Sequence, residues 1–214
     1  MNRPIIGIIG GIGSGKSFVA SLFGELGAYV IKSDDLAHAV YRQPAVKQTL
    51  RQWWGDEVLQ ADGSVNRKAI AARVFGDRAE LKRLEELVHP LVNAERERLM
   101  EQAHADPAVT AFVWDTPLLV ETDLHQLCDA VVFVDAPEDV RRARVRGRGW
   151  GAEELVRREK LQLALDKKRL VSDYIISNAA PAEAVCQQVR QVFSSIKSKD
   201  DVKQDRLSFV ELSR

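Results

Sequence analysis

The chain has 214 residues, and its 31 lysines and arginines balance its 31 aspartates and glutamates, so the formal net charge is zero. Hydrophobic residues make up 45% and charged residues 29%, which argues against global disorder and indicates one domain of ordinary size. The balanced charge gives no support to a nucleic-acid or membrane partner, and no stretch approaches the roughly 18 apolar residues of a membrane span. We therefore expect a cytoplasmic protein with neither partner.

Five short apolar runs predict β-strands at residues 4–9, 29–31, 110–114, 130–134 and 174–176. Such runs are typical of parallel strands that are covered on both faces. Helical patterns lie between them, and the first of these covers residues 16–26. The alternation predicts an α/β fold in which a five-stranded parallel sheet is flanked by helices.

The connection between the second and third predicted strands, residues 32–109, is far longer than one crossover helix requires. Its pattern predicts several helices, at about residues 34–43, 44–54, 66–75, 77–86 and 89–104. A helical insertion at this point is a natural place for a second substrate. We expect one domain at residues 1–196, with a core of residues 1–31 and 110–196 and an insertion of residues 32–109. A polar tail, either a mobile extension or a weakly held helix, is expected at residues 197–214.

Residues 10–17, Gly-Gly-Ile-Gly-Ser-Gly-Lys-Ser, match the pattern G-x-x-x-x-G-K-[ST] in full, between a predicted strand and a predicted helix. Glycines let successive backbone N–H groups turn toward phosphate oxygens, and the positive end of the following helix assists them. The alternative is a glycine-rich turn with a chance Lys-Ser pair, and the flanking strand and helix argue against it. We expect a P-loop of the NTPase type that binds the phosphates of ATP through Gly11, Ile12, Gly13, Ser14, Gly15, Lys16 and Ser17.

Within this loop, the ammonium group of Lys16 is expected at the β- and γ-phosphates, and the hydroxyl of Ser17 is expected to ligate Mg²⁺. The Asn-Lys-x-Asp and Asp-x-x-Gly motifs of GTPases do not occur in the sequence. The chain length and the helical insertion favour a small-molecule kinase.

Polar residues mark two predicted strand ends and one predicted helix break. Asp34 and Asp35 follow the second strand, where one of them could accept a proton from an attacking hydroxyl or could cap the next helix. His89 precedes Pro90 and either ends a helix or donates to a phosphate. Asp115 ends the third strand, next to the strand before the phosphate loop, where it could hold a Mg²⁺-bound water or be no more than a polar strand terminus.

Five arginines, Arg141, Arg142, Arg144, Arg146 and Arg148, follow the fourth predicted strand. Glycines at 147, 149 and 151 then precede a predicted helix at residues 152–169. The pattern predicts a lid at about residues 141–168 that carries arginines onto the triphosphate. A nucleic-acid patch and a solvated basic helix face are the alternatives.

Taken in order, the motifs resemble the dephospho-coenzyme A kinase family over residues 4–196. The resemblance rests on these pieces: residues 10–17; Asp34 with Ala37-His38; Asp62-Gly63 with Asn66-Arg67; Phe75; Leu84 with His89-Pro90; Pro117-Leu118-Leu119-Val120-Glu121; Val134-Asp135-Ala136-Pro137; Arg144; Arg148; Gln162; Lys168; and Asp173-Tyr174-Ile175-Ile176-Ser177-Asn178.

The resemblance implies ATP-dependent phosphorylation of the ribose 3′-hydroxyl of dephospho-coenzyme A, the final step of coenzyme A synthesis, with Mg²⁺ bound to the ATP. It implies that Asp34 is the catalytic base and that Lys16 and the lid residue Arg148 assist the transfer, with Arg144 on ATP. It also implies an acceptor site in the insertion and after the third strand, at Asp34, His38, His89, Pro117, Leu118 and Glu121. From the loop motif and the strand end, we expect the metal at Ser17 and Asp115. We expect a monomer or a weak homo-oligomer.

The sequence departs from the family pattern at two positions. Lys32 stands where the family often has the first carboxylate of Asp-x-Asp, and Arg141 stands where it often has glutamine. Two other functions remain open from the residues alone. One is a different small-molecule kinase, such as a nucleoside monophosphate kinase, and the other is a nucleotide-binding regulator without chemistry, which only Lys32 suggests.

Overall fold

Strand β1 (Ile5–Gly10) lies in the middle of a five-stranded sheet with the order β2-β3-β1-β4-β5 in the computed structural model, which describes residues 3–147 and 151–211. The other strands are β2 (Ala28–Lys32), β3 (Ala111–Asp115), β4 (Ala130–Asp135) and β5 (Tyr174–Ser177). β1 pairs in parallel with β3 and β4, and β4 pairs in parallel with β5. The α/β class, the parallel sheet and all five predicted strands are confirmed.

The chain divides into two compact units. Unit 1 consists of residues Met1–Ile31 and Asp106–Arg214, and unit 2 consists of residues Lys32–Ala105. Unit 1 holds the sheet together with α1 (Lys16–Glu25), η2 (Leu124–Leu127), α6 (Glu138–Arg146), α7 (Ala152–Glu159), α8 (Leu165–Leu170) and α9 (Ala182–Glu211). Unit 2 holds α2 (Ser33–Arg42), α3 (Pro44–Trp54), η1 (Asp56–Val58), α4 (Arg67–Val74) and α5 (Arg78–His104).

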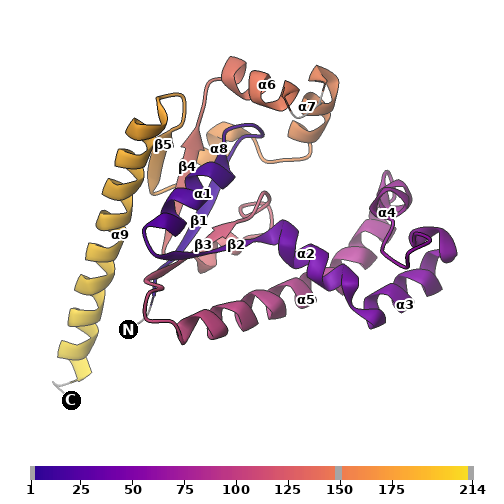
Figure 1. Cartoon of the computed structure of the whole chain (residues 1–214), viewed down its shortest axis with the longest axis horizontal. Helices are drawn as coiled ribbons and strands as arrows, with labels where there is room; N and C mark the ends of the chain where they lie inside the picture. Colours follow the sequence, from indigo (N-terminus) through magenta and orange to yellow (C-terminus); the bar gives the residue numbers. More distant parts are fainter. Residues whose placement is uncertain (1–2, 148–150, 212–214) are drawn as a thin grey trace. The chain divides into compact units, whose positions relative to one another are not determined.

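The core of unit 1 forms where α1 and α9 pack together against the sheet (Figure 1). Phe23 of α1 and Phe193 of α9 meet edge to face, with ring centroids 5.6 Å apart. Both rings contact the same apolar cluster as the strand residues Ile8 and Val132, which are fully buried. This packing fixes the strand–loop–helix connection between β1 and α1.

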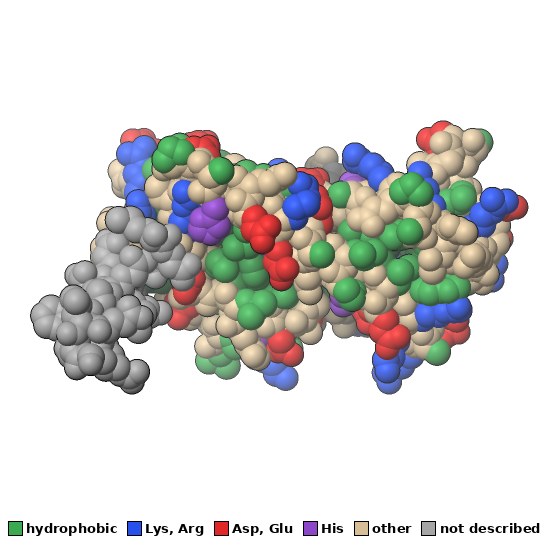
Figure 2. All heavy atoms as spheres, turned by 90° about the horizontal axis from the view of Figure 1, so that it is seen from below, with side chains coloured by type: hydrophobic (Ala, Val, Ile, Leu, Met, Phe, Trp, Pro, Cys, Tyr) green, Lys and Arg blue, Asp and Glu red, His purple; other side chains and the backbone are tan. Residues whose placement is uncertain are grey.

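Helix α9 continues through the polar residues that follow Ile196 as far as Glu211. No helix among the described residues is both long and apolar enough to cross a membrane. On the face shown in Figure 2, the basic side chains of the described residues are mixed with acidic ones.

The core of unit 2 is a separate apolar cluster that includes Val40, Leu50, Val58 and Ile70. Polar caps fix where two of its helices begin. The side chain of Asn66 accepts a hydrogen bond from the N–H of Ala69, and Asp77 accepts from two N–H groups at the start of α5.

The predicted helix break at His89–Pro90 is wrong, because α5 runs unbroken from Arg78 to His104 with Pro90 inside it. Leu84 and Val88 before the proline and Leu91 after it belong to one apolar face, which packs on the core of unit 2. Pro90 itself is exposed. The backbone carbonyl that the proline leaves without a partner is that of Glu86, which is also exposed and can be solvated by water.

The single helix predicted for residues 152–169 is also wrong, because the segment forms α7 and α8 with a break between them. At the break, the backbone N–H of Leu163 donates to the carboxylate of Glu121, 2.8 Å away. Ala164 is not helical, with φ −57° and ψ 145°. A bond to another part of unit 1 therefore replaces the helical hydrogen bond that the local pattern predicted.

Candidate active site

Residues 10–17 comprise the end of β1, a connecting loop and the start of α1, and within the loop the N–H of Ser14 donates to the carbonyl of Gly11 at 3.2 Å. Gly15 caps α1 in the left-handed conformation, with φ 90°, and no side chain hydrogen-bonds to the first turn. The first turn also contains no acidic residue. The positive end of α1 is therefore not neutralised by its own residues, which suits an anionic phosphate.

The side chain of Lys16 lies across this loop. Its ammonium group donates to the backbone carbonyls of Gly10 and Gly11, and both distances are 3.0 Å. The positive charge of Lys16 is thus held at the loop itself, where a bound phosphate chain would meet it.

Ser17 and Asp115 form a pair at the start of α1 and the end of β3. The hydroxyl of Ser17 donates to the Asp115 carboxylate at 2.7 Å. Asp115 lies opposite Ile8 in the parallel register of β3 and β1, and only 7% of its surface is exposed. A hydroxyl and a carboxylate are hard oxygen donors of the kind that Mg²⁺ prefers. The described residues contain no cluster of three or more His, Cys, Asp or Glu side chains that could hold a metal. The pair therefore fits an ion that takes its remaining ligands from water and phosphate.

Three polar side chains bind the carbonyl groups of the loop. The Arg141 guanidinium donates to the carbonyl of Ile12 at 3.1 Å. The Arg144 guanidinium and the Asn178 side-chain amide both donate to the carbonyl of Ser14, at 3.1 Å and 2.7 Å. Because a peptide group has its C=O and N–H on opposite sides, bonds that hold the carbonyls outward leave the N–H groups inward for phosphate.

Arg141 and Arg144 belong to α6, and both are fixed in the structure. Arg141 is buried, with 6% of its surface exposed, and forms an ion pair with Glu159 of α7. Arg144 also donates to the carbonyl of Asn178 at 2.7 Å. Arg148, the lid residue that the resemblance assigns to the transfer, lies outside the described residues. A pocket of about 210 Å³ adjoins the loop, lined by Gly11, Ile12, Arg141, Glu159, Gln162, Leu163, Ala164 and Leu165.

Glu121, which follows β3, forms an ion pair with the fully buried Lys168 of α8, with a 2.9 Å separation. Burial alone would raise the pKa of Glu121, but hydrogen bonds from Lys168 and from the N–H of Leu163 outweigh it, so the pKa lies below the ordinary value of 4.5. Pro117 and Leu118, the other predicted acceptor contacts after β3, are exposed.

In unit 2, the interpretation of Asp34 or Asp35 as a helix cap is wrong. The N-cap of α2 is Lys32, because the strand conformation of β2 continues to that residue and the helix begins directly after it. Asp34 and Asp35 are in the first turn, where the helix dipole favours their negative charges, and both carboxylates are exposed. His38, one turn further along α2, is hydrogen-bonded to Arg67.

His89 is exposed on α5. The structure also gives roles to two residues that were recognised only as part of the family pattern. Asn178 supports the loop from 164 positions away in the chain, and Lys168 is the buried partner of Glu121. Neither contact has a local sequence signal, because each joins elements that meet only in the folded sheet.

The comparisons by sequence identify one family. The family model described as dephospho-CoA kinase matches residues 4–183. The dephospho-CoA kinase of Anaeromyxobacter dehalogenans is 40% identical, over 90% of this chain and 92% of the relative, and that of Aquifex aeolicus is 35% identical, over 89% and 96%. The crystal structure of TT1252 from Thermus thermophilus has a TM-score of 0.80 at 31% identity, covering 91% of this chain and 98% of that one. The Campylobacter jejuni dephospho-CoA kinase shares the fold, with a TM-score of 0.66 at 22% identity over 92% and 98%.

Proposed function

The chain belongs to the dephospho-CoA kinase family, and we propose that it transfers the terminal phosphoryl group of ATP to the ribose 3′-hydroxyl of dephospho-coenzyme A. The products are coenzyme A and ADP. The observation that carries the proposal is the grouping of Lys16, Ser17 and Asp115 around a loop whose N–H groups are free of side-chain caps. Phosphoryl transfer from a nucleoside triphosphate requires a loop that binds phosphates, a positive charge beside it and oxygen ligands for Mg²⁺, and this grouping would supply all three.

On this proposal, Ser17 and Asp115 hold Mg²⁺, which supplies positive charge to the phosphate chain of ATP. Lys16 adds a second positive charge at the β- and γ-phosphates. When the nucleotide enters, its oxygens replace the carbonyls of Gly10 and Gly11 as acceptors for the Lys16 ammonium group. Because phosphoryl transfer depends mainly on positioning and charge, these contacts provide most of the rate enhancement.

The acceptor is activated by Asp34. Its carboxylate orients the ribose hydroxyl and takes the proton as the oxygen attacks the γ-phosphorus. A new P–O bond forms to the acceptor, and the bond between the γ-phosphorus and the bridging oxygen of ATP breaks, which leaves ADP. Asp34 is exposed in the first turn of α2 and is free of any capping role, which supports this assignment. Of the arginines, Arg144 supports the loop that holds ATP, and Arg148 is proposed to stabilise the charge of the transferring group.

An assay of ADP release tests the function. Mg-ATP is supplied with dephospho-coenzyme A, AMP, CMP or no acceptor, and the acceptor product is identified by mass. Release that depends on dephospho-coenzyme A, with coenzyme A as the product, is expected. Release that depends on AMP or CMP would identify a nucleoside monophosphate kinase instead. Binding of ATP and dephospho-coenzyme A without turnover would indicate a regulator and would make Lys32→Asp the next variant.

A further inference from the structure

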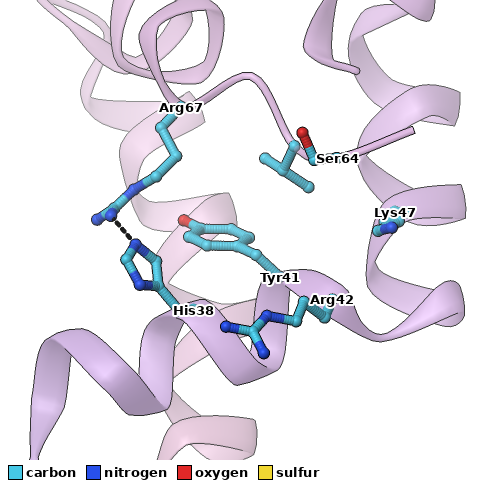
Figure 3. Close-up of a pocket in the computed structure, with 7 residues that line it drawn as sticks. His38, Tyr41, Arg42, Lys47, Ser64 and Arg67 are labelled. Carbon is cyan, nitrogen blue, oxygen red and sulfur yellow. Dashed lines mark hydrogen bonds between the residues drawn. The ribbon is translucent and has the colours of Figure 1, made fainter. Parts of the chain in front are cut away.

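Unit 2 contains a pocket of its own, about 280 Å³ in volume, which lies among α2, α3, α4 and the turn before α4 (Figure 3). Its lining is rich in basic side chains: His38, Tyr41, Arg42, Lys47, Ser64, Val65 and Arg67. Its volume is just below the range of about 300–1,000 Å³ for pockets that hold whole small molecules. The pocket therefore suits a fragment of a ligand.

The positive charges around this pocket are not neutralised by ion pairs. No ion pair between described residues involves Arg42, Lys47 or Arg67, whereas Arg51 and Arg73 of the same unit are paired with Asp56 and Glu57. Three like charges around one pocket repel one another, and a bound anion would relieve that repulsion.

His38 and Tyr41 are further polar groups of the pocket. Arg67 contacts Nε2 of His38, and because a guanidinium has only donors, Nε2 is the acceptor of this contact and Nδ1 is the ring nitrogen that can donate. Figure 3 shows the Arg67 guanidinium and the His38 ring meeting beside the Tyr41 ring. Burial raises the pKa of Tyr41, against a smaller opposite effect of Arg67, so its hydroxyl keeps its proton. The lining can therefore donate to anionic oxygens from several sides.

The pocket lies on the same helix as the proposed catalytic base. Asp34, His38 and Arg42 are spaced at i, i+4 and i+8, so they follow one another along an exposed face of α2 at steps of about 6 Å. One such step is comparable to the distance across a ribose from its 3′-hydroxyl to its 5′-phosphate. A nucleotide whose 3′-hydroxyl meets Asp34 can therefore place its 5′-phosphates at His38 and Arg42.

We propose that this pocket binds the diphosphate group of the acceptor, with Arg42, Lys47 and Arg67 as its cationic contacts and His38 and Tyr41 as further donors. The inference rests on the proposed function, because it takes dephospho-coenzyme A as the acceptor. The acceptor then lies along α2, with its sugar at Asp34 and its diphosphate in the pocket. The diphosphate carries the acceptor's negative charges at neutral pH, so this pocket supplies the electrostatic part of acceptor recognition.

The test uses Lys47→Met and Arg67→Met, with Lys68→Met as the matched control. Lys68 adjoins Arg67 on α4 and is exposed, but it does not line the pocket. Binding of dephospho-coenzyme A to the full chain is measured by calorimetry without ATP, and the KM values for both substrates are measured in the assay of ADP release. Each pocket variant is expected to weaken acceptor binding and raise the acceptor KM by about tenfold or more, which is the effect of losing one charged hydrogen bond.

The KM for ATP and kcat should change little in these variants, and Lys68→Met should resemble the wild type. Unchanged acceptor binding in both pocket variants would overturn the proposal while leaving the function intact. If either variant does not fold, as judged by thermal unfolding, Arg42→Met replaces it.

Failure of the proposed function gives a different result. If the wild type neither binds nor phosphorylates dephospho-coenzyme A, the same variants are titrated with inorganic diphosphate. Weaker binding in Lys47→Met than in Lys68→Met would then support an anion site that serves another ligand. Equal binding of diphosphate in the two variants would overturn the proposal that this pocket binds anions.

Discussion

The hydroxyl of Ser17 and the carboxylate of Asp115 are 2.7 Å apart in the folded protein, although 98 positions separate them in the chain. One stands in the first turn of α1 and the other at the end of β3, and the parallel pairing of β1 with β3 brings them together. The sheet therefore places side by side the two oxygen groups that we propose as metal ligands.

Replacement of Asp115 by asparagine keeps the shape of the pair and removes its charge. We expect the Mg²⁺ concentration for half-maximal activity to rise by about 10–100-fold, because the ion loses a carboxylate contact. Activity is measured over a magnesium titration at fixed total ATP. Ser17→Thr retains the hydroxyl and serves as the control, and an unchanged magnesium requirement in Asp115→Asn would exclude Asp115 from the metal site.

Replacement of Lys16 by alanine should reduce turnover more than any other single change in the loop. Loss of one preorganised charge at the transferring group is expected to lower kcat by about 10²–10³-fold or more. Turnover is measured with saturating ATP and acceptor, and ATP binding is measured separately. Near-normal turnover in this variant would refute the assignment of the loop as the catalytic nucleotide site.

Two adjacent carboxylates in the first turn of α2 provide a matched pair of variants. Asp34→Asn is expected to lower kcat by about 10²–10⁴-fold, because the general base is lost. Asp35→Asn changes the same charge in the same helical turn and should leave kcat within a few-fold of the wild type. The kcat and KM of both variants are measured by steady-state kinetics. A change in Asp34→Asn that is confined to KM would count against the role of Asp34 as the general base.

The contact between Gly15 and Asn178 makes a further variant informative. A Cβ atom at Gly15 would lie 2.1 Å from the side-chain nitrogen of Asn178, at a φ of +90°. We expect Gly15→Ala to displace Asn178 and to lower ATP affinity by on the order of tenfold or more. Gly76→Ala is the control, because Gly76 has a similar φ of +84° but open space around it. The double variant Gly15→Ala with Asn178→Ala removes the collision and distinguishes it from backbone strain.

The ion pair between Glu121 and Lys168 makes stability depend on pH. Since the folded protein lowers the pKa of Glu121 below 4.5, the pair stabilises the fold above that pH, and the contribution is lost as the pH falls through the folded pKa. Glu121→Gln should lower the free energy of unfolding at pH 7 by about 1–3 kcal/mol, because the Lys168 charge loses its counter-ion. Unfolding of both proteins between pH 7 and pH 3.5 should show the difference shrinking on the acid side. A difference that stays constant over this range would contradict the role of the ion pair.

The sequence predicted the strands and the phosphate loop well because both depend on local patterns. An apolar run of strand length and the motif at residues 10–17 can each be recognised without knowing which distant residues pack against them. The break predicted at Pro90 failed because the tertiary packing of Leu84, Val88 and Leu91 outweighs the local preference of proline. The single helix predicted after Gly151 failed because Glu121 binds the backbone at Leu163.

The candidate site was predictable in part for the same reason. Lys16 and Ser17 belong to a contiguous motif, whereas the supporting contacts of Arg141 and Asn178 join segments far apart in the chain. The sequence pattern predicts that the arginines after β4 reach the triphosphate from a lid, whereas Arg141 is buried, with Glu159 and the carbonyl of Ile12 as its partners. The roles of the acceptor residues Asp34, His38, His89, Pro117, Leu118 and Glu121 stay predictions.

The support of the loop by Arg141, Arg144 and Asn178 has a consequence for how the protein is made. Residues 10–17 leave the ribosome early. The two strands that flank β1 in the sheet, β3 and β4, are synthesised later. The side chains that bind the carbonyl groups of the loop come after both strands. A nascent chain that stops before residue 174 lacks both the final strand of the sheet and one of these donors, Asn178. We therefore expect the proposed ability to bind ATP to arise near the end of synthesis.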